Sequence, residues 1–467
     1  MTNDAPEKAL CEYANTLIID DIDSETQQFI SHLIFDAIAI SIGAYASGHQ
    51  SGMINEDMAL ENNNNTSGST LWSGRGKLPA DIAALCNGTW TEILDFQDVV
   101  VDPRNNGHLG VTIVPAAIAI AERENSSGAE VIAAVTAGLE VSIAALRAVG
   151  RNHRSEGKGF RTTSLAAPLG AAVACAKLLN LTPEKISNAM GIAGACSPNG
   201  LMPSLSAANG SFGMDKDWVN GFAAQLAVNA ADLAKHGMTA SDRVITGEMG
   251  IVASHSHGDG MPLMVPKNGA PNIKYISLKK YAACYGVHSA MEAASDLIQK
   301  HDPDIAEIKK VVVRVKQDSA KTLATRNITN HMAARFSLPY AVATAIIRCE
   351  KSSIHDFEEP AIFDESVISF MKHIEIVADG ELTRFHHETG GFPAIVEIHT
   401  QSDVFQERID YPIGSSQRPM SRDDLTFKFE ELTSSHFSSA QRKTIAQKAM
   451  NLADLDSICQ LTALLEI

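Results

Sequence analysis

The 467-residue sequence lacks the short motifs that mark the common cofactor-binding and disulfide-bonded proteins. It has no G-x-G-x-x-G after an expected strand, no P-loop, no H-E-x-x-H and no G-x-S-x-G. Nicotinamide, nucleotide, zinc-protease and serine-hydrolase chemistry therefore have no support from motifs. Its seven cysteines are odd in number and never form a C-x-x-C pair, which argues against a disulfide framework and a zinc ribbon. We expect buried thiols.

Positive charge is also scarce. The 38 Lys and Arg residues against 55 Asp and Glu residues give a formal net charge of −17, which repels nucleic acid and anionic lipid at long range. The sequence has no run of eighteen apolar residues, and its N-terminus lacks the basic flank and apolar core of a signal peptide. We expect a cytoplasmic protein without a nucleic-acid or membrane partner, in which an anionic metabolite needs a local cluster of Lys, Arg and His.

Apolar residues recur at helical spacing through most of the first 270 residues. The length suits two or three domains, and 45% apolar residues are ample for a large core. The segment 47–70 is dominated by Gly, Asn and Ser and is predicted to be a loop. Helices are predicted at 12–46 (two helices), 80–88, 111–123, 129–149, 163–179, 182–195 and 218–236.

The pattern changes after about residue 271. β-Branched runs predict strands at 309–316, 374–378, 394–400 and 405–411. Helices are predicted between them, and again at 438–465. The sequence therefore predicts a mainly α fold: a large all-α helical domain (1–269 plus 405–467) with an inserted smaller α+β lid domain (270–404).

The stretch 93–110, I-L-D-F-Q-D-V-V-V-D-P-R-N-N-G-H-L-G, gathers three carboxylates and an imidazole. Asp95, Asp98 and Asp102 precede the turn residues that present His108 before the next apolar segment. A histidine presented in this way is expected to titrate near neutrality and to give or take a proton. The alternative is that the carboxylates cap and charge a surface loop.

Three cationic side chains stand near predicted helix ends. Lys216 lies between the glycine-rich backbone at 210–213 and an Ala-rich helix, where it could hold a carboxylate together with backbone N–H groups. Arg161 precedes another helix in the same way, and an ordinary surface residue is the alternative for both. His288, near the hinge into the second domain, taken alone would be structural.

Two histidine pairs invite a metal interpretation. His255 and His257 alternate in a Gly-rich stretch, and His386 is followed directly by His387. Such pairs are more often part of solvated loops than metal ligands. We therefore expect no metal site.

Several segments, in order along almost the whole chain, match the sequence pattern of one known protein family. They are Asn87-Gly88, Leu94-Asp95-Phe96-Gln97-Asp98 followed by His108, Gly213-Met214-Asp215-Lys216 before Gly221-Phe222-Ala223-Ala224, Tyr281 to His288, Ala334 to Tyr340, Pro412-Ile413-Gly414 with Pro419-Met420, and Lys428-Phe429. Together they resemble the MmgE/PrpD family, which includes 2-methylcitrate dehydratase, cis-aconitate decarboxylase and iminodisuccinate epimerase.

The resemblance implies a helical domain broken by an α+β lid, a homodimer, and an active site between the two domains that uses no cofactor. It assigns catalytic roles to Asp95, His108, Lys216 and His288. We further predict that Arg161, Asp98, Lys280 and Tyr281 bind the substrate.

The sequence departs from the family pattern at five positions. Gln97 replaces an Asp, Val99 a frequent Thr, Leu109 the Pro after the histidine, and Arg161 and Val219 each replace a His. Several of these positions are expected to contact the substrate. The departures therefore bear on which acid is bound.

The family's three chemistries make or break a bond to carbon next to a carboxylate, on which negative charge builds, so cations are needed nearby. The favoured hypothesis is a cofactor-independent hydro-lyase on a small di- or tricarboxylic acid. His108 would move the proton, while Lys216 and Arg161 would hold carboxylates. The alternatives are an epimerase, isomerase or decarboxylase using the same α-proton chemistry, and a non-catalytic carboxylate-binding protein.

Overall fold

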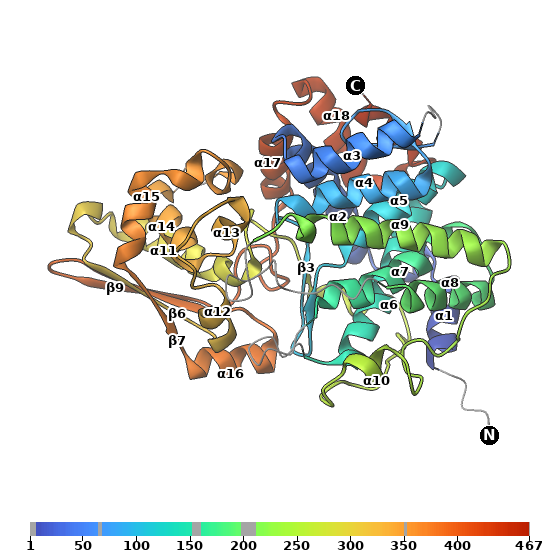
Figure 1. Ribbon diagram of the computed structural model, residues 1–467, viewed down its shortest axis with the longest axis horizontal. Helices are drawn as coiled ribbons and strands as arrows, with labels where there is room; N and C mark the ends of the chain where they lie inside the picture. The colour runs from blue at the N-terminus through green and yellow to red at the C-terminus, as the bar shows by residue number, and fades with distance from the viewer. Residues whose placement is uncertain (1–5, 64–67, 152–159, 198–211, 350–352, 467) are drawn as a thin grey trace.

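The structure is a computed structural model that describes residues 6–63, 68–151, 160–197, 212–349 and 353–466. The fold is mainly α, as predicted, and Figure 1 shows two lobes side by side. The larger lobe is built from both ends of the chain. Its helices are α1 (Pro6–Thr16), α2 (Ser24–Ala46), α3 (Gln50–Asn62), α4 (Ala80–Ile93), α5 (Gly110–Glu124), α6 (Gly128–Val149), α7 (Thr162–Leu178), α8 (Pro183–Ala195), α9 (Asp215–Lys235), α10 (Ile251–His255), α17 (Arg422–Thr433), α18 (Ser439–Met450) and α19 (Cys459–Thr462).

Small residues let the central helices of this lobe pack closely. A Cβ on Gly170 of α7 would lie 2.0 Å from the carbonyl oxygen of Gly138 on α6, so only glycine fits at this crossing. A capping box fixes the start of α6, because Ser127 accepts from the Glu130 amide while Glu130 accepts from the Ser127 amide. Helices rich in Ala and Gly thereby form one continuous hydrophobic core.

The smaller lobe has its own hydrophobic core around a four-stranded sheet. The strand order is β7-β6-β8-β9, with β6 parallel to β7 and the other pairs antiparallel. On β8, Ala394, Val396 and Ile398 are buried and their neighbours are not, the alternation of a sheet with one covered face. The elements are β6 (Lys310–Val315), β7 (Ile374–Ala378), β8 (Ala394–His399), β9 (Val404–Ile409), α11 (Tyr285–His301), α12 (Gln317–Thr322), α13 (His331–Arg335), α14 (Leu338–Arg348), α15 (Glu365–Phe370) and α16 (Gly380–Thr389).

Three details differ from the sequence prediction. The expected loop 47–70 contains the helix α3. Its Asn and Gly residues have low helix propensity, but packing against α4 and α9 stabilises the helix. The larger lobe is not purely helical, and the predicted boundary between residues 404 and 405 falls inside β9. The missed strands are short: β1 (Ser69–Thr70), β2 (Lys77–Leu78), β3 (Val99–Val101) and β4 (Asn106–Gly107).

One of the missed strands connects distant parts of the chain. β3 pairs with β4 on one side and with β5 (Ile276–Ser277) on the other, and Figure 1 places it where the two lobes meet. The β-branched run Val99–Val101 is the sequence signal for it. Because β3 and β4 follow α4 and precede α5, this small sheet holds the segment between these two helices at the junction of the lobes.

Two helices of the larger lobe, α2 and α6, are long and apolar enough to cross a membrane by length and composition. However, 78% of the most apolar 18-residue stretch of α2 and 89% of that of α6 are buried inside the protein. Such burial is typical of core helices in a soluble domain.

Candidate active site

The turn that ends α4 carries Asp95, which links two buried lysines. Its φ of +49° lies in the left-handed region, which aspartate tolerates better than most residues. Lys216 Nζ lies 2.9 Å from Asp95 Oδ1, and Lys279 Nζ lies 2.9 Å from Oδ2. Burial opposes ionisation, but the two ammonium groups hold the pKa of Asp95 well below its usual range. Asp95 is therefore a permanent anion that positions two cations.

Lys216 reaches the site from the first turn of α9, which packs unusually close to α4. A Cβ on Gly221 would lie 2.4 Å from the Leu85 carbonyl oxygen, so glycine permits this approach. Lys216 Nζ also lies 2.9 Å from Glu92 Oε1 and donates to the Glu92 carbonyl at 3.2 Å. Although burial lowers the pKa of Lys216, Asp95 and Glu92 together raise it above its ordinary value. The ammonium is charged at neutral pH.

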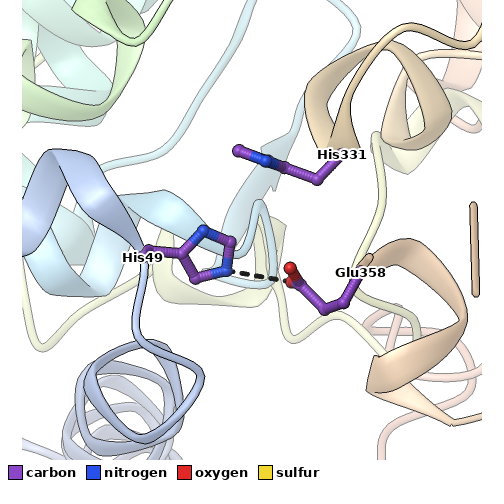
Figure 2. A group of neighbouring side chains, drawn as sticks. All are labelled: His49, His331 and Glu358. Carbon is purple, nitrogen blue, oxygen red and sulfur yellow. Dashed lines mark hydrogen bonds and ion pairs between the residues drawn. The ribbon is translucent and has the colours of Figure 1, made fainter. Parts of the chain in front are cut away.

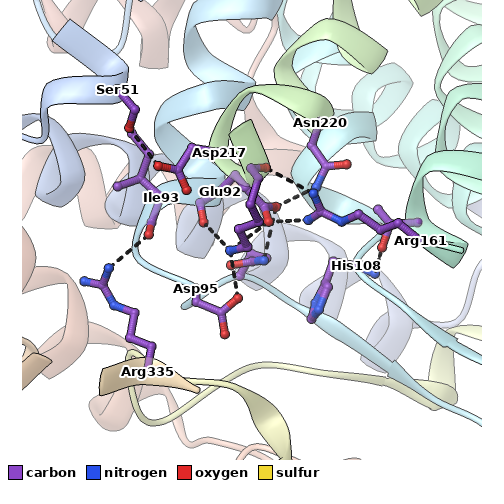
Figure 3. A network of polar contacts seen from close by, with 12 residues as sticks. Ser51, Glu92, Ile93, Asp95, His108, Arg161, Asp217, Asn220 and Arg335 are labelled. Atoms are coloured by element: carbon purple, nitrogen blue, oxygen red, sulfur yellow. Dashed lines mark hydrogen bonds and ion pairs between the residues drawn. The ribbon is translucent and has the colours of Figure 1, made fainter. Parts of the chain in front are cut away.

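Glu92 is the centre of a second group of contacts (Figure 3). It is fully buried and pairs with Arg161 as well as with Lys216. Asn220 Nδ2 donates to Glu92 Oε2 at 2.5 Å, and Gln97 Nε2 donates to the same oxygen at 3.2 Å. Burial raises the pKa of Glu92, but Arg161 and Lys216 bring it below the usual value. Sequence reasoning missed Glu92, because the helix was predicted to end at residue 88.

His108 lies beside this network without an ion pair to it (Figure 3). Its Nδ1 is 2.6 Å from the Asp98 carbonyl oxygen, which can only accept, so Nδ1 carries the proton and Nε2 is left as a base. Burial and the nearby Lys279 ammonium lower the pKa of His108 to about 4. The expected titration near neutrality is therefore wrong. At neutral pH the imidazole is uncharged.

The backbone amide of His108 and the side chain of Asp98 fix the start of α5. Thr163 Oγ1 accepts from the His108 amide at 2.9 Å. Asp98 Oδ2 accepts from the Leu109 and Gly110 amides at 3.1 and 3.0 Å, at the N-terminus of the helix. Asp98 is thus placed as a helix cap that also orients His108.

A cavity of about 90 Å³ brings together four of the predicted residues: Asp95, His108, Arg161 and Lys216. Its remaining wall includes Val99 from β3 and aromatic side chains of the smaller lobe. These aromatic residues are Tyr285, Phe336 and Phe392. The cavity therefore lies between the lobes.

The other predicted residues lie outside the wall of this cavity. His288 is fully buried, with its ring centroid 5.3 Å from that of Tyr281 and 5.2 Å from that of Tyr285. Its Nε2 is 3.2 Å from the Ala283 carbonyl oxygen, and burial lowers its pKa to about 3. Lys280 is exposed and lines a separate cavity together with Tyr281.

Lys279, next to Lys280, is the lysine that reaches the site. It is fully buried and donates to both the carboxylate and the carbonyl of Asp95. The sequence prediction named Lys280 instead, which is exposed and lies outside the cavity around His108.

The charged side chains in the cavity wall are more positive than negative. Among the described residues, Arg161 and Lys216 line the cavity with positive charge and Asp95 with negative charge. Other charged side chains lie close to the site but outside this wall: Glu92, Asp98, Asp217 and Lys279. The wall itself is thus positive in a protein whose net charge is −17. This arrangement suits a carboxylate beside the Nε2 base of His108.

Comparisons with known proteins cover nearly the whole chain. The family model described as the MmgE/PrpD N-terminal domain matches residues 8–264, and the MmgE/PrpD C-terminal domain matches residues 281–452. The chain is 25% identical to cis-aconitate decarboxylase of Aspergillus terreus (strain NIH 2624 / FGSC A1156), covering 98% of this chain and 94% of that protein. It is 25% identical to cis-aconitate decarboxylase of Homo sapiens, covering 85% and 82%. The corresponding values for the Mus musculus protein are 24%, 86% and 82%.

Proposed function

The chain belongs to the MmgE/PrpD family, and on that premise we propose that it is a cofactor-independent lyase acting next to a carboxylate of a small di- or tricarboxylic acid. The positive wall of the cavity, with Arg161 and Lys216 beside the Nε2 base of His108, carries this proposal. A bound carboxylate would balance this positive charge, and negative charge that grows on that carboxylate during reaction would be stabilised further.

Arg161 and Lys216 would face the carboxylates of the substrate, held by Glu92 and Asp95, while Lys279 would hold Asp95 from outside the cavity wall. His108 would move the proton at carbon through Nε2, since Nδ1 is occupied by the Asp98 carbonyl. A substrate anion bound beside the ring would raise the pKa of His108. The same imidazole could therefore take a proton and return it within one turnover.

Two reactions fit this arrangement. In decarboxylation, the carbon–carbon bond to one carboxylate breaks, carbon dioxide leaves, and the electron pair left behind takes a proton at carbon. In dehydration, the Nε2 base removes the proton next to a carboxylate, the bond from carbon to the neighbouring hydroxyl breaks, and the protonated base returns the proton so that water leaves. The names of the related decarboxylases favour the first reaction, whereas the neutral resting state of His108 favours the second. Decarboxylation of a cis-aconitate-like acid is our first candidate, and the hydro-lyase favoured by the sequence is the second.

The smaller lobe would act as a lid, because its aromatic side chains close one side of a small cavity. Substrate entry would require the lobes to separate, and closure would exclude water from the reacting groups.

A screen of di- and tricarboxylic acids by proton NMR in heavy water tests the proposal. Water loss, carbon dioxide loss and deuterium uptake at carbon are followed together. We expect at least one acid to react with wild-type protein and not with His108→Ala. The matched control is His236→Ala, which removes an exposed imidazole at the end of α9. If no acid reacts, or if the two variants behave alike, the proposal is wrong.

A further inference from the structure

A second group of ionisable side chains lies between the lobes, away from the cavity around His108. It consists of His49, which precedes α3, with His331 at the start of α13 and Glu358 (Figure 2). One imidazole nitrogen of each histidine and one carboxylate oxygen all lie within 4.8 Å of one another. The three side chains come from both lobes and converge on a common point.

The hydrogen bonds within the group are incomplete. His49 Nε2 lies 3.0 Å from Glu358 Oε1, a separation that also suits two ligands of one tetrahedral ion. His331 Nε2 is buried and has no hydrogen-bond partner within the part of the chain that the structure describes. An unpaired buried nitrogen is costly and calls for an explanation. A bound ion would supply the missing partner.

The surrounding cavity favours a cation. It has a volume of about 790 Å³, and its wall adds His355, Glu359 and Glu431 to the group. No lysine or arginine is among the described residues that line it. Arg335 reaches Glu358 and balances one carboxylate, but the other two keep the wall negative. This charge is opposite to that of the cavity around Lys216.

We propose that His49, His331 and Glu358 form a binding site for a divalent transition-metal ion of the Zn²⁺ type. Two imidazoles and one carboxylate are a common protein ligand set for such ions, with the remaining position left to water. Zinc–nitrogen distances of about 2.0–2.1 Å place tetrahedral ligand atoms about 3.3 Å apart, so the ligand atoms, now within 4.8 Å of one another, must draw together by up to about 1.5 Å. The ion would tie the larger lobe, through His49, to the smaller one.

This site is separate from the proposed lyase chemistry, which takes no step through the ion. It also does not involve the pairs His255/His257 and His386/His387, neither of which belongs to a described metal-ligand group. The competing explanation is an interlobe ion pair of His49 with Glu358, backed by Arg335, which needs no metal.

Calorimetric titration of chelator-treated, dialysed protein with Zn²⁺ tests the site, and visible absorption with Co²⁺ reports its coordination. We expect one Zn²⁺ ion to bind per chain, with an affinity well above that of unspecific surface sites. His331→Gln should weaken Zn²⁺ binding by roughly 100-fold, because one of three protein ligands is lost. His236→Gln is the matched control, since it removes an exposed imidazole outside the cavity, and it should bind as the wild type does.

His331→Cys guards against a folding defect, because a thiolate is also a Zn²⁺ ligand and should restore binding. Circular dichroism confirms that each variant is folded. The proposal would be overturned if wild-type protein bound Zn²⁺ no more tightly than His331→Gln does. Equal losses of Zn²⁺ affinity in His331→Gln and His236→Gln would also overturn it. Failure here leaves the lyase proposal untouched, since the NMR screen requires no added metal.

Discussion

The two cavities between the lobes differ in the sign of their charge, although they share the same interface. Among the described residues, the cavity around His108 is lined by Arg161 and Lys216 against the carboxylate of Asp95, whereas the one around His49 is lined by carboxylates and imidazoles without a lysine or arginine. Arg335 lies between them, donating to the Ile93 carbonyl on one side and to Glu358 on the other. One interface can thus offer separate sites to an anion and to a cation.

The comparison depends first on Asp95, which pairs with both Lys216 and Lys279. Asp95→Asn should leave both buried ammonium groups without their shared counter-ion. Breaking a buried pair costs about 3–5 kcal/mol of unfolding free energy, and activity should fall below detection. Urea denaturation and turnover assays check this, with Asp20→Asn as an exposed control. A stable, active Asp95→Asn protein would remove the premise that the cations need Asp95.

The second prediction separates proton transfer from charge stabilisation. His108→Ala should lower turnover by about 10²–10⁴-fold while the folded protein still binds the acid. Lys216→Ala should damage binding and turnover together, because its ammonium pairs with Glu92 and Asp95 beside the substrate. Deuterium exchange at substrate carbon measures the proton step. If His108→Ala exchanges at the wild-type rate and Lys216→Ala does not, the two roles are reversed.

The third prediction concerns pH. The pKa of His108 is about 4 in the folded protein against 6.5 for an exposed imidazole, so the free enzyme has its neutral base at any pH well above 4. The acid limb of kcat/KM should therefore fall near pH 4, and at pH 5 most activity should remain. An acid limb near pH 6.5 would mean that burial and Lys279 do not suppress the protonation of His108.

The same pKa has a consequence for stability. Between pH 6.5 and 4 the unfolded chain binds a proton at residue 108 that the folded chain does not. Stability contributed by this residue is therefore complete above pH 6.5 and is lost as pH falls toward 4. His288, with a pKa of about 3, acts in the same direction.

The sequence predicted much of this arrangement and missed specific parts for physical reasons. Turns and helix starts singled out Asp95, His108, Lys216 and Arg161 as candidates, and the family resemblance gave site roles to the first three. The cavity brings all four together. Glu92 was missed because the helix was predicted to end at residue 88, whereas α4 continues to Ile93 and its last turn packs against α9.

Side chains along an extended segment point alternately to opposite sides, so Lys279 is buried and Lys280 is exposed. Two adjacent lysines do not show from sequence alone which one points inward. The low pKa of His108 depends on burial and on Lys279, both of which are properties of the packed interface. The group of His49, His331 and Glu358 spans more than 300 residues, and no local spacing reveals it.

The most direct test of the central claim is calorimetric binding of a non-reacting tricarboxylate, propane-1,2,3-tricarboxylate, to wild-type protein and to Arg161→Gln. Removing Arg161 takes the net charge of the lining residues, counted over Arg161, Lys216 and Asp95, from +1 to zero. We predict binding of one acid per chain that weakens about tenfold in the variant, the loss of one charge-assisted contact. Equal affinities for the two proteins, or no binding to either, would contradict the account.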